Sequence, residues 1–244
     1  MRPLLLCLSA AVALNGEGCA TAPPGMTGWL KFDEPMFRAK SPHAPDVIPG
    51  KVGSALRFDG NGQFFELPPG TKGWDPGTGD FSVELWVRTT ETRTLNIVDK
   101  RSHDPWGWVI FVWKGELHFQ VPTPAGHDNT VHRAAGPNPR YKIADGKWHH
   151  VAGVARRLPP GKFQVYVDGV LRGESLQNTT LRNITVAAPM WLARHHANAE
   201  AETDEKYFPG GIDEMSFYTR ALAPSEIQAI YRAGSQGKCS PSAK

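Results

Sequence analysis

Two adjacent acidic residues near the C-terminus are the first candidates for chemistry. Asp213 and Glu214 lie in a segment, residues 212–218, that we predict to be a half-buried strand. Side chains alternate between the two faces of a strand, so these carboxyl groups should point in opposite directions. The acid pairs that hydrolyse glycosidic bonds must instead converge on one bond. We therefore do not expect this pair to act as a catalytic couple.

Histidine pairs are the second candidates, because imidazole nitrogens bind zinc. His149 and His150 lie in a predicted strand, where their rings should face opposite sides of the sheet. His195 and His196 lie in a polar stretch, residues 194–207, that we predict to be a loop, and no spacing there requires a metal. No nucleophile elbow accompanies any of the nine histidines. These residues favour a protein that is not an enzyme.

Tryptophan side chains offer a different kind of chemistry. The C–H groups of a sugar ring pack against flat aromatic faces, while its hydroxyls bond to polar side chains. Trp106 and Trp108 should share one face of a predicted strand, and Trp113 should lie on the other face. Trp74 lies in a loop bounded by Gly and Pro and is expected to be the most exposed. We expect at least one tryptophan to form an exposed platform for a ligand.

The composition fits one large domain that is rich in turns. The chain has 244 residues, of which 25 are Gly and 21 are Pro, and 40% are hydrophobic. All-β domains often reach about 200–250 residues, so a single domain accounts for this length. The net charge of +3 and the lack of a Lys/Arg stripe argue against nucleic acid as a partner.

The elements that must position these residues are short strands separated by turns. Asp168 and Gly169 are typical of a two-residue hairpin turn, and Pro224 suits the first position of a short C-terminal helix. Two long loops, residues 122–140 and 194–207, should be functional or disordered. Runs of strands with little helix favour a sandwich or jelly roll. The predicted strands are residues 29–34, 55–58, 64–67, 81–88, 95–98, 107–113, 117–121, 148–155, 163–167, 185–186, 190–193 and 212–218.

Four segments carry more specific sequence patterns. They are Gly-Ser-Ala-Leu-Arg-Phe-Asp-Gly at 53–60, Phe-Ser-Val-Glu-Leu-Trp-Val at 81–87, Lys-Trp-His-His-Val-Ala at 147–152 with Tyr-Val-Asp-Gly at 166–169, and Gly-Ile-Asp-Glu at 211–214 with Ala-Leu-Ala-Pro-Ser-Glu-Ile at 221–227. In this order they resemble a laminin-G-like jelly roll of the concanavalin A-like lectin/glucanase superfamily. The resemblance implies an all-β, two-sheet antiparallel jelly-roll sandwich with a short C-terminal helix. The last strand would return beside the first and close the sandwich.

The resemblance also implies a non-catalytic recognition module that binds a glycan or polysaccharide. Glucanases of the superfamily carry a Glu-x-Asp-x-x-Glu strand, and its nearest match here, Glu202 and Asp204, has Tyr207 at the third acidic position. Two alternatives stay open: a protein-adhesion or scaffold module of the cell surface, which would bind an extracellular protein, and a polysaccharide-degrading enzyme. The residues expected to face a ligand are Trp74, Trp106, Trp108, His127, Asp128, Asn129, His195 and His196.

Calcium is the cofactor that the resemblance implies, because members of the superfamily often hold this ion. Asp33 in the first predicted strand and Asp213 in the last would lie near each other in a closed jelly roll, and carboxylate oxygens suit Ca²⁺. The other interpretation is that these carboxylates satisfy backbone groups at a turn or bulge.

The N-terminus resembles an export signal. Arg2 precedes an apolar run, residues 4–14, that is too short to span a bilayer and is typical of a signal peptide. We predict a signal peptide and linker over residues 1–22, the jelly-roll domain over 27–233 and a tail over 234–244. The protein would then be secreted or periplasmic, with no transmembrane segment.

The cysteines depend on where that signal is cleaved. Cys7 would leave with the signal, whereas Cys19 and Cys239 would remain if cleavage is early. Because the ends of a closed sandwich often lie close together, we predict a Cys19–Cys239 disulfide. A lipid anchor on Cys19 is the alternative, and cleavage after Ala22 would remove Cys19 altogether.

Overall fold

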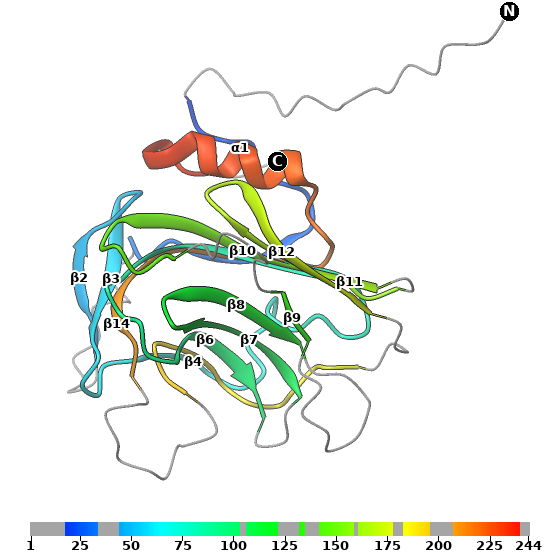
Figure 1. The fold of residues 1–244 in the computed structure, drawn as a ribbon, viewed down its shortest axis with the longest axis horizontal. Coiled ribbons are helices and arrows are strands. Elements are labelled where there is room, and N and C mark those ends of the chain that lie inside the picture. The colour runs from blue at the N-terminus through cyan, green and yellow to red at the C-terminus, as the bar shows by residue number, and fades with distance from the viewer. Residues whose placement is uncertain are drawn as a thin grey trace, which may run out of the picture.

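The structure, a computed structural model, describes residues 18–33, 44–102, 106–121, 132–134, 142–158, 161–177, 183–195 and 207–239. Within these ranges the chain forms two antiparallel sheets that pack face to face, with one α-helix on the outside of the larger sheet (Figure 1). The predicted all-β jelly-roll sandwich is confirmed.

The larger sheet has eight strands in the order β12-β11-β10-β5-β14-β3-β2, and β1 pairs with β14. Asp168 and Gly169 form the predicted hairpin turn between β11 and β12, with φ angles of 53° and 74°. The strands are β1 (Met26–Leu30), β2 (Asp46–Pro49), β3 (Ser54–Asp59), β5 (Phe81–Arg88), β10 (Trp148–Arg156), β11 (Gly161–Val167), β12 (Val170–Gln177) and β14 (Pro209–Tyr218).

The smaller sheet has six strands in the order β4-β13-β6-β7-β8-β9. The short strand predicted at 185–186 is not present, whereas β2, β9 and β12 are strands that the sequence pattern did not predict. The strands of this sheet are β4 (Phe65–Leu67), β6 (Leu95–Arg101), β7 (Gly107–Trp113), β8 (Glu116–Val121), β9 (His132–Ala134) and β13 (Met190–Leu192).

Strand β14 organises the larger sheet. β5 pairs along one side of it, while β3 pairs with its first half and β1 with its second half on the other side. The register places Ile212 opposite Leu56 and Ser216 opposite Trp29. The first and last predicted strands therefore lie side by side as expected, although β1 begins and ends earlier than predicted.

A β-bulge interrupts β14 between Asp213 and Ser216. Glu214 has a positive φ of 53° there, which costs a non-glycine residue roughly 1–3 kcal/mol. Because the bulge adds a residue, Ile212 and Met215 both lie in the core, and Asp213 and Glu214 both turn to the outward face. The prediction that these two carboxyl groups point in opposite directions is therefore wrong.

The main core lies between the two sheets and is centred on aromatic rings. Phe217 of β14 stacks on Phe81 and on Trp108, with ring centroids 5.6 Å and 5.8 Å apart. All three side chains are fully buried. Burying each side chain of this size contributes about 1.5–3 kcal/mol to stability, so this cluster holds the two sheets together.

Helix α1 (Pro224–Ala233) covers the outward face of the larger sheet (Figure 1). Its apolar side chains Ile227 and Ile230 pack with Leu222 and Tyr218 into a second, smaller core. The predicted C-terminal helix that begins at Pro224 is thus confirmed, and it ends in a 3₁₀ turn, η3 (Gly234–Gln236).

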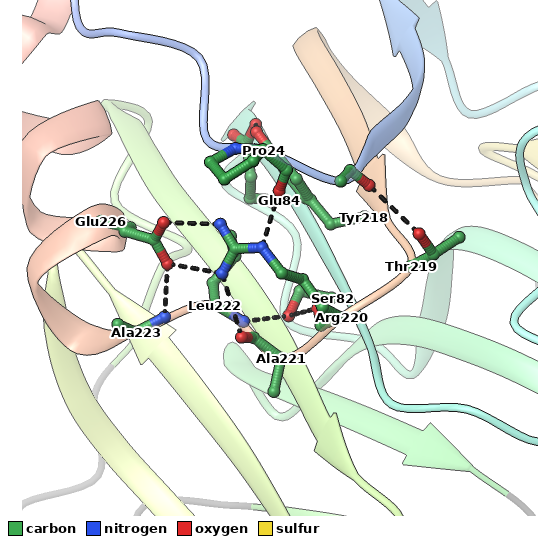
Figure 2. Close-up of polar contacts among 11 residues, drawn as sticks. Pro24, Ser82, Glu84, Tyr218, Thr219, Arg220, Ala221, Leu222, Ala223 and Glu226 are labelled. Atoms are coloured by element: carbon green, nitrogen blue, oxygen red, sulfur yellow. Dashed lines mark hydrogen bonds and ion pairs between the residues drawn. The ribbon is translucent and has the colours of Figure 1, made fainter.

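Polar contacts fix the corner between β14 and α1, as Figure 2 shows. Arg220 donates to both carboxylate oxygens of Glu226, at 2.8 Å and 2.5 Å, and Nε of Arg220 donates to the Pro24 carbonyl at 2.6 Å. The Glu226 carboxylate also accepts the backbone N–H of Ala223, which no helical carbonyl can satisfy. The Arg220 side chain therefore joins the start of α1, the corner and the N-terminal segment.

The two ends of the described chain are joined covalently. Cys19 and Cys239 form a disulfide with a Cα–Cα distance of 5.2 Å, as predicted. Beside it, the Ala20 N–H donates to the Gly237 carbonyl at 2.9 Å, and the Cys239 N–H donates to the Ala20 carbonyl at 2.8 Å. The ordered chain thus extends beyond the domain limits of 27 and 233.

The described residues contain no helix that is long and apolar enough to cross a membrane. Residues 1–17 of the predicted signal peptide and linker, 1–22, lie outside the described residues. A lipid on Cys19 and the disulfide exclude each other, because both would use the same sulfur atom.

Candidate ligand-binding site

The outward face of the smaller sheet carries a row of polar and aromatic side chains. The register aligns Glu66 of β4, Trp191 of β13, Asp99 of β6 and Gln120 of β8 across the sheet, with Val109 between the last two. Their neighbours along each strand lie in the main core, so these side chains point away from it. The indole N–H of Trp191 donates to Glu66 at 2.8 Å.

Asp99 forms a compact ion pair at the middle of this row. Arg101 donates from Nε and Nη2 to the two carboxylate oxygens of Asp99, at 2.8 Å and 2.7 Å, and the Asn96 amide donates at 2.7 Å. The Asp99 carboxylate is fully buried. A bidentate pair of this kind fixes the orientation of both groups, so the row is rigid at its centre.

A stacked cluster of rings surrounds Trp191, toward the β4 end of the row. The Arg194 guanidinium lies 4.5 Å from the ring centroid of Trp191 and 4.6 Å from that of Phe64. Phe64 in turn stacks on Tyr207, at 6.3 Å between centroids. Arg194 and Tyr207 pair as an isolated antiparallel bridge and so bring together the two ends of the predicted 194–207 loop. We call Phe64, Trp191, Arg194 and Tyr207 the arginine clamp.

Arg194 also carries an unmatched donor. Its Nε atom is buried and has no hydrogen-bond partner among the residues that the structure describes. Leaving a buried donor unsatisfied costs about 1–3 kcal/mol. Stacking against two rings can offset part of this cost, since cation–π contacts are worth about 0.5–2 kcal/mol. An acceptor supplied by a ligand would satisfy the donor.

A second aromatic group lies on the same face, on β7 and β8. His118 stacks on Phe111 with ring centroids 5.0 Å apart and meets Trp113 edge-on at 5.2 Å. The ammonium of Lys114 lies over the Trp113 ring at 4.9 Å. Trp113 is half-buried and lies opposite the core face, as its position in the strand predicts.

The tryptophans expected to form an exposed platform are buried or half-buried in the structure. Trp108 is fully buried in the core, because it shares a face with Ile110 and Val112. Trp74 is only 4% exposed, so its expected exposure is wrong. Its indole lies against Gly28, where an added Cβ would be 2.6 Å from the ring. Trp106 is half-buried and packs against the core.

The remaining predicted ligand residues divide into two groups. His195 is half-buried at the start of the 194–207 loop, next to the arginine clamp. His127, Asp128, Asn129 and His196 lie outside the described residues. No sequence pattern indicated the arginine clamp, although Arg194 and Tyr207 lie at the two ends of the 194–207 loop that was predicted to face a ligand.

Asp33 and Asp213, the predicted calcium ligands, flank one turn between β2 and β3. Asp33 accepts the Ser54 N–H at 2.7 Å, and Asp213 accepts the Val52 N–H at 2.9 Å. Burial raises the pKa of Asp213 to about 7. Within the described ranges no group of three or more His, Cys, Asp or Glu side chains could hold a metal ion. The geometry fits carboxylates that satisfy backbone amides at a turn.

A second charged cluster is buried beneath the C-terminal segment, on the outward face of the larger sheet. Nζ of Lys238 lies 3.1 Å from carboxylate oxygens of both Glu84 and Glu214, and His150 lies 3.0 Å from Glu84. Burial opposes the ionisation of Glu84, but Lys238 and His150 outweigh it and hold the pKa of Glu84 at about 2. The four side chains are between 0% and 6% exposed, so this cluster is closed to ligands.

Comparisons with known proteins agree with this architecture. A laminin-G family model, described as the concanavalin A-like lectin/glucanases superfamily, matches residues 59–228. A sequence search of curated proteins found no match.

Three solved structures illustrate the similarity of fold. The binding domain of Paraclostridial Mosquitocidal Protein 1 matches with a TM-score of 0.61 and 17% identity, over 84% of this chain and 47% of that one. Domain 4 of an extracellular arabinanase from Geobacillus stearothermophilus, solved with arabinotriose, matches with a TM-score of 0.58 and 21% identity, over 83% and 96%. Domains LG4-5 of the mouse laminin alpha1 chain match with a TM-score of 0.53 and 20% identity, over 76% and 48%.

The family model identifies the family, and the solved structures show a shared fold. The chain spans about half the length of the toxin binding domain and of the laminin fragment. Identities this low show a shared fold and leave the ligand open. The family model, however, covers more than half of the chain. The protein therefore belongs to the concanavalin A-like lectin/glucanases superfamily.

Proposed function

We propose that the protein is a non-catalytic module that binds a glycan through the outward face of its smaller sheet. The observation that carries this proposal is the arginine clamp, where Arg194 is stacked between two rings and one of its donors has no partner. Sugar hydroxyls are suitable acceptors, and the neighbouring ring of Tyr207 offers a surface for sugar C–H groups. Glu66 is the exposed member of the adjoining row, so it would extend the site beside the clamp.

The acidic residues of this face favour binding over hydrolysis. Asp99 is held by Arg101 and Asn96, and Glu66 accepts the indole N–H of Trp191. A glycosidase needs one carboxyl group that donates a proton and a second that attacks or activates water. Both acids of the row are instead committed to neighbours. The arabinotriose in the Geobacillus structure supports a sugar as the ligand class.

A glycan array followed by calorimetry tests the proposal, starting with arabinose oligosaccharides. The variants Arg194→Ala and Tyr207→Ala should weaken binding by about tenfold or more, since each loses a stacked or donor contact. Arg194→Lys keeps the charge but loses the planar stack, so it should also bind weakly. Arg232→Ala, an exposed change on α1, serves as the control. Unchanged affinity in both clamp variants would reject the site.

Calcium assistance remains part of the proposal as a prediction. Because the described residues offer Asp33 and Asp213 but no third ligand, an ion there would need oxygens from other parts of the chain. Thermal melts with calcium and with a chelator decide the question. A shift in Tm that Asp33→Asn abolishes would support the ion, and identical melts would exclude it at this pair.

A second candidate is a module that binds an extracellular protein. The edge strand β12 exposes Leu171 and Leu176, at 41% and 69%. Exposed apolar side chains at an unpaired strand edge favour contact with another chain. Light scattering that shows a monomer, together with sugar binding, would favour the first candidate. Export to an oxidising compartment fits both, since the disulfide joins the ends of the domain.

A further inference from the structure

A groove of about 260 Å³ opens on the outward face of the larger sheet, where β14 begins. The register aligns Arg57 of β3, Gly211 of β14 and Arg88 of β5 in adjacent positions. The residues next to them, such as Val87 and Leu56, lie in the core, so the aligned positions face outward. The side chains of Arg57 and Arg88 therefore lie on the two sides of Gly211.

The floor of the groove is bare backbone. Gly210 and Gly211 both line it, and neither could carry a side chain without displacing a neighbour. A Cβ on Gly210 would lie 2.5 Å from the Arg88 carbonyl oxygen, and one on Gly211 would lie 2.7 Å from the Trp148 indole. These two glycines let the Trp148 indole and the Arg88 backbone approach β14 closely beside the groove.

The two arginines differ in how their charge is compensated. Arg57 is paired with Asp46, an exposed contact in which Nε lies 3.1 Å from the carboxylate. Arg88 lies over the ring of Trp148, 5.0 Å from its centroid, and forms no hydrogen bond or ion pair with the described residues. Stacking holds the plane of the guanidinium while leaving its N–H groups free to bind. Arg88 is thus an oriented and uncompensated cation beside an open groove.

We propose that this groove is a second binding site, for a sugar residue that carries a carboxylate, as uronic acids do. The planar carboxylate matches the Arg88 fork, which can bind both of its oxygens. Arg57 and the Thr90 hydroxyl line the same groove and can bind ring hydroxyls. The groove is slightly smaller than the range of about 300–1,000 Å³ that is typical of pockets for drug-sized ligands. Its volume therefore suits one sugar ring. This site lies on the other sheet from the arginine clamp and does not rest on the proposed function.

Calorimetry with a matched pair of probes tests the carboxylate assignment. Trigalacturonic acid and a neutral galactose trisaccharide differ chiefly in their carboxylates, so the acid should bind at least about tenfold more tightly. The preference should shrink as salt is raised, because exposed charges are screened. Equal binding of the two probes, or binding of only a sulfated trisaccharide or an acidic peptide, would overturn the proposal.

Variants then assign the binding to this groove. Arg88→Ala should lose the preference for the acid, and Arg88→Lys should keep only part of it, because an ammonium cannot bind both oxygens in one plane. Arg232→Ala, an exposed change on α1, should leave acid binding unchanged. The Arg88→Ala and Arg88→Lys proteins should keep the circular-dichroism spectrum and Tm of the parent protein. An Arg88→Ala protein that retains full acid preference would place the site elsewhere.

Discussion

The two sheets both bury charged side chains on their outward faces, but they compensate these charges in different ways. On the smaller sheet, Asp99 is paired with Arg101, two residues along the same strand. On the larger sheet, Glu84 and Glu214 are paired with Lys238, which comes from the C-terminal segment. The first pair forms as soon as its strand forms, whereas the second requires the chain ends to be in place.

This difference indicates two roles. A locally compensated pair remains intact when a ligand approaches, so it suits a binding face. The Lys238 cluster instead links the fold to the position of the terminal segment, which the disulfide holds beside Ala20. We therefore interpret the smaller sheet as the face for ligands and the Lys238 cluster as a clasp that closes the domain.

The largest expected effect comes from removing the cation of the clasp. Lys238→Met leaves Glu84 and Glu214 buried without a counter-charge and should cost about 3–5 kcal/mol of unfolding free energy. Chemical denaturation measures this loss. Adding Glu84→Gln should recover part of it, because one buried charge is then removed. Lys162→Met, in an exposed pair with Glu174, should cost less than about 1 kcal/mol. Equal effects of the two lysine changes would remove the distinction between clasp and surface pair.

Removing the disulfide should come next in size. Replacing Cys19 and Cys239 with alanine should cost about 2–5 kcal/mol, because the unfolded chain regains freedom. Since the disulfide and Lys238 hold the same segment, the combined variant should lose less than the sum of the two effects. Strict additivity in a double-mutant cycle would show that they act independently.

Breaking the local pair should have a smaller effect on stability and a larger one on binding. Arg101→Ala removes the bidentate partner of Asp99 but keeps the Asn96 amide and one backbone donor, and should cost about 2 kcal/mol. It should also weaken glycan binding, because the centre of the row loses its fixed orientation. Arg93→Ala, an exposed pair with Glu91, is the control for stability. Normal glycan affinity in Arg101→Ala would confine the binding site to the arginine clamp.

The smallest expected effect is the change in stability between pH 6 and 8. Burial raises the pKa of Asp213 from 3.8 to about 7, so the folded protein retains a proton that the unfolded chain releases near pH 4. Stability should therefore fall as pH rises above about 4, and the loss should be complete above about 7. Between pH 6 and 8 the loss due to Asp213 should be about 1 kcal/mol, and Asp213→Asn should reduce the observed pH dependence by that amount. A variant with the same pH dependence as the parent would assign it to another group.

Much of the fold could be predicted from local patterns. Alternation placed Trp108 and Trp113 on opposite faces of β7, as observed, but the face of Trp108 lies in the core and not toward a ligand as expected. Trp74 could not be placed in this way, because it lies in a loop and its burial depends on Gly28 in a strand far away in sequence. The arginine clamp was missed for a related reason, since Phe64 and Trp191 come from different strands and meet at Arg194 only when the sheet forms.

The sequence by itself determined most of the strands, the Asp168–Gly169 turn and the helix that begins at Pro224, because backbone geometry imposes a period of two on strands and turns require particular residues. Only the tertiary structure decided that a bulge turns Asp213 and Glu214 to the same face, and that Lys238 compensates carboxylates from two other strands. Strand register and bulges depend on partners that are distant in sequence, so no local pattern specifies them.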